Sequence, residues 1–214
     1  MSIVPHKYIC IEGNIGAGKT TLCKMLERDY PCKLLLEQFT DNPFLPYFYK
    51  EPDRYAFPLE LFFLTERYKQ LQQNLLSGDL FHDFILSDYS FVKTLLYAKN
   101  NLSSEEYRLF TNLFNVLNTN FPWPDVLVYI HRSIPILKEH IKMRGRLYET
   151  EITDQYLQNI QDAYFEYFRS ELGFPILIID ADKLDFLKSE NHYLEIKRLL
   201  EREYQPGIQR ISIL

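Results

Sequence analysis

The chain has 214 residues, of which 46% are apolar, enough for one domain with a substantial buried core. Its 29 acidic and 24 basic residues leave a net charge of -5, which excludes the broad basic surface that nucleic acid or an anionic membrane would attract. No membrane span or signal peptide is visible, and three unpaired cysteines suit reduced thiols, so we expect a soluble, cytoplasmic protein.

Apolar runs of strand length alternate with helical patterns along the chain. The expected strands are Tyr8–Ile11, Lys33–Leu36, Phe84–Leu86, Val126–Ile130 and Pro175–Ile179. The expected helices are Lys19–Arg28, Ala56–Leu76, Phe91–Asn100, Ser104–Asn118, Ser133–Met143, Thr153–Leu172 and Tyr193–Tyr204. The spacing leaves room for crossover helices, so the pattern predicts an α/β fold in which helices flank a parallel sheet of about five strands.

The chain shows no linker or repeat, so residues 1–214 are expected to form a single domain. Gly78 and Gly173 stand where helices should stop. The stretch from Asn42 to Pro58 is predicted to be irregular or to contain a short helix, and residues 205–214 are predicted to be a surface extension.

A glycine-rich motif follows the first strand and opens the first helix. Only 7 glycines occur in the chain, and three of them fall in this segment, which matches GxxxxGK[ST]. Backbone N–H groups and Lys19 would bind the phosphates of a nucleoside triphosphate, and the Thr20 hydroxyl would ligate Mg²⁺. The predicted ATP-binding residues of this loop are Gly13, Asn14, Ile15, Gly16, Ala17, Gly18, Lys19, Thr20 and Thr21.

Further motifs appear in a fixed order after this loop. Glu37 ends the second strand, Asn42-Pro43-Phe44-Leu45 follows, and Arg144-Gly145-Arg146 precedes Glu149. In this order the chain resembles the deoxynucleoside kinases, roughly from Tyr8 to Arg202. The resemblance implies a bacterial member with a three-layer P-loop kinase fold and an arginine-containing lid at about residues 144–152. It also implies ATP-dependent phosphorylation of a deoxyribonucleoside at its 5′-hydroxyl, with Mg²⁺, by a homodimer that serves nucleoside salvage.

The residues themselves point to the same acceptor. Glu37 lies at the carboxyl end of a parallel strand beside the phosphate loop, where it could accept the proton of an attacking hydroxyl. Ten aromatic residues between Phe39 and Tyr68 offer flat surfaces for a base, although many of them belong to the core. The same segment has few arginines, so a neutral nucleoside fits better than a nucleotide with a dianionic phosphate.

The resemblance assigns substrate contacts to four side chains. It places Glu37 nearest the 5′-hydroxyl, Tyr49 and Glu149 at the sugar 3′-hydroxyl, and Arg67 at the base. Glu60 stands where much of the family has a glutamine. Since an ionised glutamate only accepts hydrogen bonds, Glu60 either favours amino-bearing purines, deoxyadenosine first, or pairs with Arg67 two helical turns away.

After the third strand the family has an acid, an arginine and a serine, whereas this chain has Asp88-Tyr89-Ser90. Asp88 is the expected second Mg²⁺ ligand and shares the candidate general-base role with Glu37. Tyr89 is a candidate substrate contact without the arginine's charge. A different alignment would place Asp88 on a later family acid and Asp83 near the arginine, but it leaves no strand ahead of the motif.

The lid and the last strand complete the predicted site. Arg144 and Arg146 end a helix, where they could stabilise the charge on the transferring phosphoryl group or merely complement the helix dipole. The resemblance favours the catalytic role for both, together with Lys19, and adds Arg144 to the ATP site. His140 replaces a further lid arginine, and Asp182 follows the last strand on a loop that would lie near the ATP adenine.

Two other functions remain open on the sequence. A nucleoside monophosphate kinase of the thymidylate kinase type would require a phosphate on its acceptor. A non-catalytic P-loop protein would bind the nucleotide without transferring phosphate, as the missing arginine at Tyr89 could permit. Neither the deoxynucleoside nor the preferred phosphate donor follows from the motifs.

Overall fold

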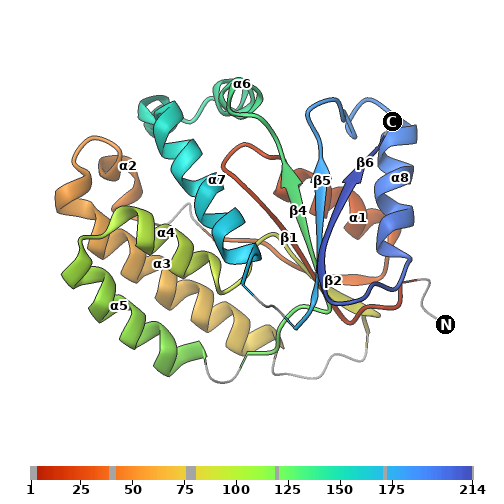
Figure 1. Ribbon diagram of the computed structural model, residues 1–214, viewed down its shortest axis with the longest axis horizontal. Coiled ribbons are helices and arrows are strands. Elements are labelled where there is room, and N and C mark those ends of the chain that lie inside the picture. Colours follow the sequence, from red (N-terminus) through yellow and green to blue (C-terminus); the bar gives the residue numbers. More distant parts are fainter. Residues whose placement is uncertain (1–3, 39–41, 76–80, 119–120, 171–172, 214) are drawn as a thin grey trace.

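The structure is a computed structural model in which residues 4–38, 42–75, 81–118, 121–170 and 173–213 are described (Figure 1). Phe39, Gly78 and the expected helix ends at Leu76 and Leu172 lie outside these residues. Within them, no helix is both long and apolar enough to cross a membrane.

Six parallel strands form one sheet in the order β2-β3-β1-β4-β5-β6. Their bounds are β1 Tyr8–Gly13, β2 Cys32–Leu35, β3 Phe84–Ser87, β4 Val126–His131, β5 Pro175–Asp180 and β6 Gly207–Ser212. The five expected strands are confirmed, and the sheet has one strand more than expected.

The prediction of a surface tail is wrong, because β6 pairs with β5 along its whole length, from Pro175 opposite Gly207 to Asp180 opposite Ser212. An edge strand is held by backbone hydrogen bonds on one side only and buries little side-chain surface. No residue of β6 is fully buried, so the apolar pattern that marks the inner strands is weak there.

The helices follow the strands and cover both faces of the sheet (Figure 1). Their bounds are α1 Lys19–Asp29, α2 Leu45–Phe48, α3 Pro52–Leu75, α4 Lys93–Asn101, α5 Ser104–Leu117, α6 Ile134–Arg144, η2 Leu147–Glu151, α7 Asp154–Phe168 and α8 Glu190–Leu200. Helices α3, α4 and α5 pack together beside the sheet, and α4 also packs on α7.

Alternation along the inner strands gives the sheet two apolar faces. Ile9 and Ile11 of β1 join a core formed with α1, α6 and α8, whereas Cys10 between them joins a core formed with α4 and α7. The three layers are therefore helix, sheet and helix, as the sequence predicts.

Several helix bounds differ from the prediction. Helix α4 begins at Lys93 and not at Phe91, and α7 ends at Phe168, before the predicted Leu172. Helix α3 begins at Pro52 and contains Pro58, although residues up to Pro58 were expected to be irregular or briefly helical. Pro58 lacks the N–H that would bond Arg54 four residues earlier, and the exposed position of Arg54 lets water replace that bond. Helix α8 begins and ends earlier than expected, at Glu190 and Leu200, with Ser189 as its N-cap.

Candidate active site

The carboxyl ends of β1, β2 and β3 bring three motifs to one edge of the sheet. The glycine-rich loop follows β1, Glu37 follows β2, and Asp88 comes directly after β3. Asp83 precedes β3 and Asp88 directly follows it, which favours the alignment that places Asp88 at the strand end. Ligands of parallel α/β sheets bind at this edge.

The glycine-rich loop requires glycine for its backbone path. Gly16 has φ 84°, and a Cβ there would lie 2.8 Å from the carbonyl oxygen of Leu137. Gly18 has φ 98° and is the N-cap of α1, so the first N–H groups of the helix are directed at the loop. The loop thus has the backbone geometry of an anion-binding P-loop.

Lys19 lies over the loop and donates from Nζ to the carbonyl oxygens of Gly13, at 2.8 Å, and Asn14, at 3.0 Å. Burial, and after it the charge of Lys93, lowers the pKa of Lys19 to about 8. The ammonium therefore lies at the centre of the phosphate-binding loop, in a setting where a phosphate anion would stabilise its charge.

Three side chains fasten the loop to its surroundings. Asn14 is buried and donates to the Leu157 carbonyl of α7 at 2.8 Å. His140 Nδ1 lies 2.8 Å from the Gly16 carbonyl oxygen, so α6 is held against the loop. Arg132, buried at the end of β4, donates to the carbonyls of Ala17, Leu184 and Ala181. It thereby ties the phosphate loop to the segment after β5.

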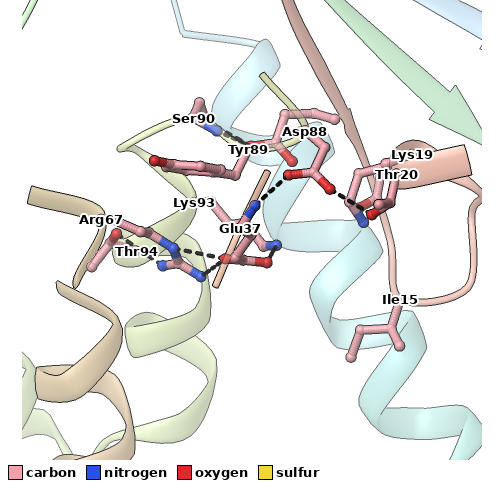
Figure 2. Close-up of polar contacts among 12 residues, drawn as sticks. Ile15, Lys19, Thr20, Glu37, Arg67, Asp88, Tyr89, Ser90, Lys93 and Thr94 are labelled. Carbon is pink, nitrogen blue, oxygen red and sulfur yellow. Dashed lines mark hydrogen bonds and ion pairs between the residues drawn. The ribbon is translucent and has the colours of Figure 1, made fainter. Parts of the chain in front are cut away.

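A chain of short contacts leads from the loop to the acceptor side (Figure 2). The Thr20 hydroxyl donates to Asp88 Oδ2 at 2.5 Å, and the other oxygen of Asp88 accepts from the Glu37 backbone N–H at 2.7 Å. Thr20 and Asp88 offer the oxygen ligands that Mg²⁺ takes from a protein when phosphates supply the rest. The residues present therefore fit a Mg²⁺ ion beside the triphosphate.

The Glu37 carboxylate is held between two cations (Figure 2). Oε1 accepts from Arg67 Nε at 2.8 Å and Nη2 at 2.5 Å, and Oε2 accepts from Lys93 Nζ at 2.5 Å. Burial would raise the pKa of Glu37, but the charges of Lys93 and Arg67 outweigh it and lower the pKa to about 2. Glu37 is therefore ionised and fixed in orientation at neutral pH.

Glu60 does not pair with Arg67, so that alternative is wrong. Arg67 donates from Nη1 to Thr94 Oγ1 at 2.9 Å and otherwise to Glu37, whereas Glu60 Oε1 accepts from Asn101 Nδ2 at 2.6 Å. Glu60 Oε2 is buried without a partner among the described residues. Burial raises the pKa of Glu60 to about 7, although the Arg67 charge opposes the rise.

The tyrosine that replaces the family arginine lies in the core. Tyr89 is fully buried, and its hydroxyl donates to Gln70 Oε1 of α3 at 2.6 Å. Its neighbour Ser90 is anchored by Glu12, which accepts from the Ser90 N–H and hydroxyl, both at 2.7 Å. Glu12 on β1 therefore anchors the Asp88-Tyr89-Ser90 segment through Ser90.

The lid residues form a second charged cluster. Arg144 donates to Glu149 Oε2 from Nε at 2.9 Å and Nη2 at 2.5 Å, and Arg146 lies 3.2 Å from Glu149 Oε1. Gly145 between them has φ 70° and ends α6. Arg144 follows His140 by one turn of the helix that contacts the loop, so the lid and the loop share one rigid support.

Tyr49 lies within electrostatic range of both Glu149 of this lid cluster and Glu60. Its ring packs edge-on against Tyr156, with 5.8 Å between the centroids. Burial raises the pKa of Tyr49, and Tyr156 followed by the charges of Glu149 and Glu60 raises it further. Tyr49 and Asn101 also line a cleft of about 400 Å³ between α2, the end of α4 and the start of α7, whose lining does not include Glu37, Glu60 or Arg67.

Several of these residues are not apparent from their sequence positions. Lys93 and Asn101, at the two ends of α4, contact Glu37 in the segment after β2 and Glu60 on α3. Glu12 and Arg132 bind partners far along the chain. The one usable signal is Lys93, a cation five residues after Asp88. Asp182 accepts from the Ser133 N–H at 2.7 Å and thus contacts the start of α6.

The sheet order, the loop and the acid beside it define a P-loop phosphotransferase. Comparison with known proteins specifies the family, since residues 9–203 match deoxynucleoside kinase. A deoxyguanosine kinase of Bacillus subtilis is 32% identical over 196 residues, covering 88% of this chain and 93% of that protein. The deoxyadenosine/deoxycytidine kinase of the same organism is 30% identical, covering 88% and 89%. The protein belongs to the deoxynucleoside kinase family.

Solved structures agree with this assignment. Deoxyadenosine kinase from M. mycoides with bound dATP superimposes with a TM-score of 0.79 and 25% sequence identity, covering 91% of this chain and 99% of that one. The expected kinase fold and phosphotransferase class are therefore confirmed. The relatives carry different base names, so the base has to be argued from the site itself.

Proposed function

We propose that this kinase transfers the γ-phosphoryl group of ATP to the 5′-hydroxyl of an amino-bearing purine deoxyribonucleoside. The observation that carries the proposal is the unbroken contact chain Thr20–Asp88–Glu37–Arg67. Through three successive hydrogen bonds, it connects the phosphate loop to α3, the helix that also carries Glu60. A donor phosphate held beside Thr20 and an acceptor hydroxyl held by Glu37 would be neighbours.

In the proposed reaction, the P-loop N–H groups and Lys19 hold the triphosphate, and Mg²⁺, held by Thr20 and Asp88, would neutralise phosphate charge. Glu37 accepts a hydrogen bond from the 5′-hydroxyl and orients its oxygen toward the γ-phosphorus. The new oxygen–phosphorus bond forms as the bond to the β,γ-bridging oxygen breaks, the hydroxyl proton passes to a carboxylate, and ADP leaves.

The low pKa of Glu37 bears on the role of this residue. A carboxylate with a pKa of about 2 is a weak base. Phosphoryl transfer usually proceeds through a loose transition state in which the nucleophile needs little activation, so orientation of the hydroxyl contributes more than early removal of its proton. We therefore assign Glu37 chiefly to positioning, with Asp88 near enough to share the proton.

The preference for a purine with an amino group rests on Glu60. Its unpartnered Oε2 and its position near Arg67 leave it as a hydrogen-bonding group for a base. When ionised, the carboxylate accepts from the adjacent N1–H and amino donors of guanine. When protonated, it donates to N1 and accepts from the amino group of adenine. Deoxyguanosine and deoxyadenosine are thus both candidates, selected by the proton on Glu60.

A coupled ADP-release assay with deoxyadenosine, deoxyguanosine, deoxycytidine and thymidine, each with ATP or GTP, tests the proposal. Parallel reactions with the four deoxynucleoside monophosphates test the monophosphate-kinase alternative. Turnover with a purine deoxynucleoside is the expected result. Turnover only with monophosphates, or ATP binding without transfer, would overturn the proposal. Light scattering of the same sample tests the homodimer that we also propose.

A further inference from the structure

The segment after β3 supplies no positive charge to the site. Asp88 faces Thr20 and the Glu37 backbone, and the next residue, Tyr89, is neutral, fully buried and bonded to Gln70. A buried carboxylate such as Glu37 requires compensation, and the charge that develops on a transferring phosphoryl group requires cations beside it. Arg67 compensates Glu37 at Oε1 only, so a cation beside Oε2 would have to provide the charge on this side of the acceptor.

Lys93 lies where that charge is needed. It is the first residue of α4, its side chain is only 5% exposed, and its Nζ is 2.5 Å from Glu37 Oε2. The ring of Tyr97, one turn later on α4, lies 5.4 Å from the same ammonium. A lysine loses hydration when it is buried, so this position is occupied only because Glu37 and the aromatic ring replace the lost water.

The ammonium also faces the donor site. In Figure 2 the Lys93 amine lies on the side of the Glu37 carboxylate toward Lys19 and Thr20. The charge of Lys93 is the largest effect on Lys19 after burial, which places the two ammonium groups within electrostatic reach of each other. Two cations held together without a phosphate repel each other, and an anion bound between them would relieve that repulsion.

The hydrogen bonds of Glu37 and Lys93 leave one acceptor position and further donor positions for the two reactants. A carboxylate has about four acceptor positions and an ammonium has three donors. Arg67 fills two positions on Oε1 and Lys93 fills one on Oε2, so one position on Oε2 remains for the 5′-hydroxyl. Lys93 in turn has further N–H groups beside that hydroxyl, where the phosphoryl group arrives.

We propose that Lys93 is a catalytic cation of this kinase: it holds Oε2 of Glu37 and donates to the phosphoryl group during its transfer to the acceptor hydroxyl. This proposal rests on the proposed function and assigns it a residue outside the family's acid-arginine-serine segment. Lys93 then performs its role from α4, and Tyr89 can be a core residue without loss of charge at the site.

Steady-state kinetics of Lys93→Met and Lys93→Arg test the proposal, with Lys99→Met as the matched control. Lys99 lies on the same helix and pairs with Glu166, but its side chain is 49% exposed. We expect Lys93→Met to lower kcat on the order of 100-fold, as the loss of one group that stabilises transition-state charge does. The KM for ATP should change by less than about threefold, because the P-loop and Lys19 hold the triphosphate.

Lys93→Arg keeps the charge and should remain within about tenfold of the wild-type kcat, and Lys99→Met should not change it. In a Glu37→Gln background, Lys93→Met should lower kcat by a much smaller factor than in the wild type. The reason is that Glu37 and Lys93 both act on the transfer of the phosphoryl group to the acceptor hydroxyl. Melting curves verify that each variant is folded. If Lys93→Met does not fold, Lys93→Gln takes its place with the same expected kcat loss.

An unchanged kcat for folded Lys93→Met or Lys93→Gln would overturn the role of Lys93, as would an arginine variant no better than methionine. A kcat loss fully additive with Glu37→Gln would also overturn it. These failures are distinct from failure of the proposed function, in which the wild-type enzyme itself phosphorylates no deoxynucleoside.

Discussion

Arg67 grips Glu37, a residue 30 positions earlier in the chain, with two N–H groups and does not pair with Glu60 on its own helix. As a consequence, Arg67 and Glu60, both on α3, have different roles. Arg67 fixes the acid that faces the acceptor hydroxyl, and Glu60 keeps a buried oxygen for the base. Glu37 thus serves phosphoryl transfer, and Glu60, at a separate position, serves recognition of the base.

The selectivity between purines should depend on pH. Because burial raises the pKa of Glu60 to about 7, the protonated form suits adenine below this pH and the ionised form suits guanine above it. We expect the ratio of kcat/KM for deoxyadenosine to that for deoxyguanosine to fall as pH rises from about 6 to 8. Glu60→Gln cannot titrate, so its ratio should be flat; an equal pH slope in both enzymes would refute this role.

The same carboxyl group should affect stability. In the unfolded chain Glu60 has the ordinary pKa of 4.5, and in the folded protein its pKa is about 7. Its protonated form therefore contributes stability that is fully present below pH 4.5 and lost as pH rises through 7, by at most about 3 kcal/mol. Melting temperatures should show the wild type falling relative to Glu60→Gln between pH 5 and 8; parallel curves would contradict this.

Arg67→Lys should destabilise the protein, because a lysine cannot bond Glu37 at two points and Thr94 as well. We expect a loss of about 1–3 kcal/mol in the free energy of unfolding, measured with urea at pH 7. Arg54→Lys is the control on the same helix, since the Arg54 side chain is 72% exposed. Equal small effects of the two changes would show that the buried pairing is unimportant.

Gly16→Ala should abolish ATP binding. The new Cβ would lie 2.8 Å from the Leu137 carbonyl oxygen, at a φ of 84° that alanine rarely adopts, so either the loop or α6 must shift. Gly173→Ala is the matched control, because, apart from its chain neighbours, none of the described residues has an atom within 4 Å of its Cβ position. Calorimetric titration with ATP checks both variants; tight binding by Gly16→Ala would mean that the loop adapts.

The sequence predicts those parts of the site whose positions are set by local structure. Asp88 and Glu37 follow buried strands, and parallel strands end at one edge of a sheet, so their proximity to the glycine-rich loop could be inferred. The choice of partners could not. Whether Arg67 meets Glu37 or Glu60, and what Lys93 and Asn101 contact, depends on how α3 and α4 pack around β2 and on side-chain orientation within that packing. Strand β6 was not predicted, because backbone hydrogen bonds to β5 stabilise it and its side chains show little burial pattern.

Direct chromatographic detection of the 5′-monophosphate product, with wild type and Glu37→Gln side by side, tests the central claim most directly. The wild type should convert deoxyadenosine or deoxyguanosine to its 5′-monophosphate with ATP. Glu37→Gln should bind ATP equally well but form product on the order of 100-fold or more slowly, since the acceptor oxygen loses its orienting carboxylate. A wild type that forms no monophosphate from any deoxynucleoside, or a Glu37→Gln variant that forms it at the full rate, would contradict this role of Glu37 and of the kinase site.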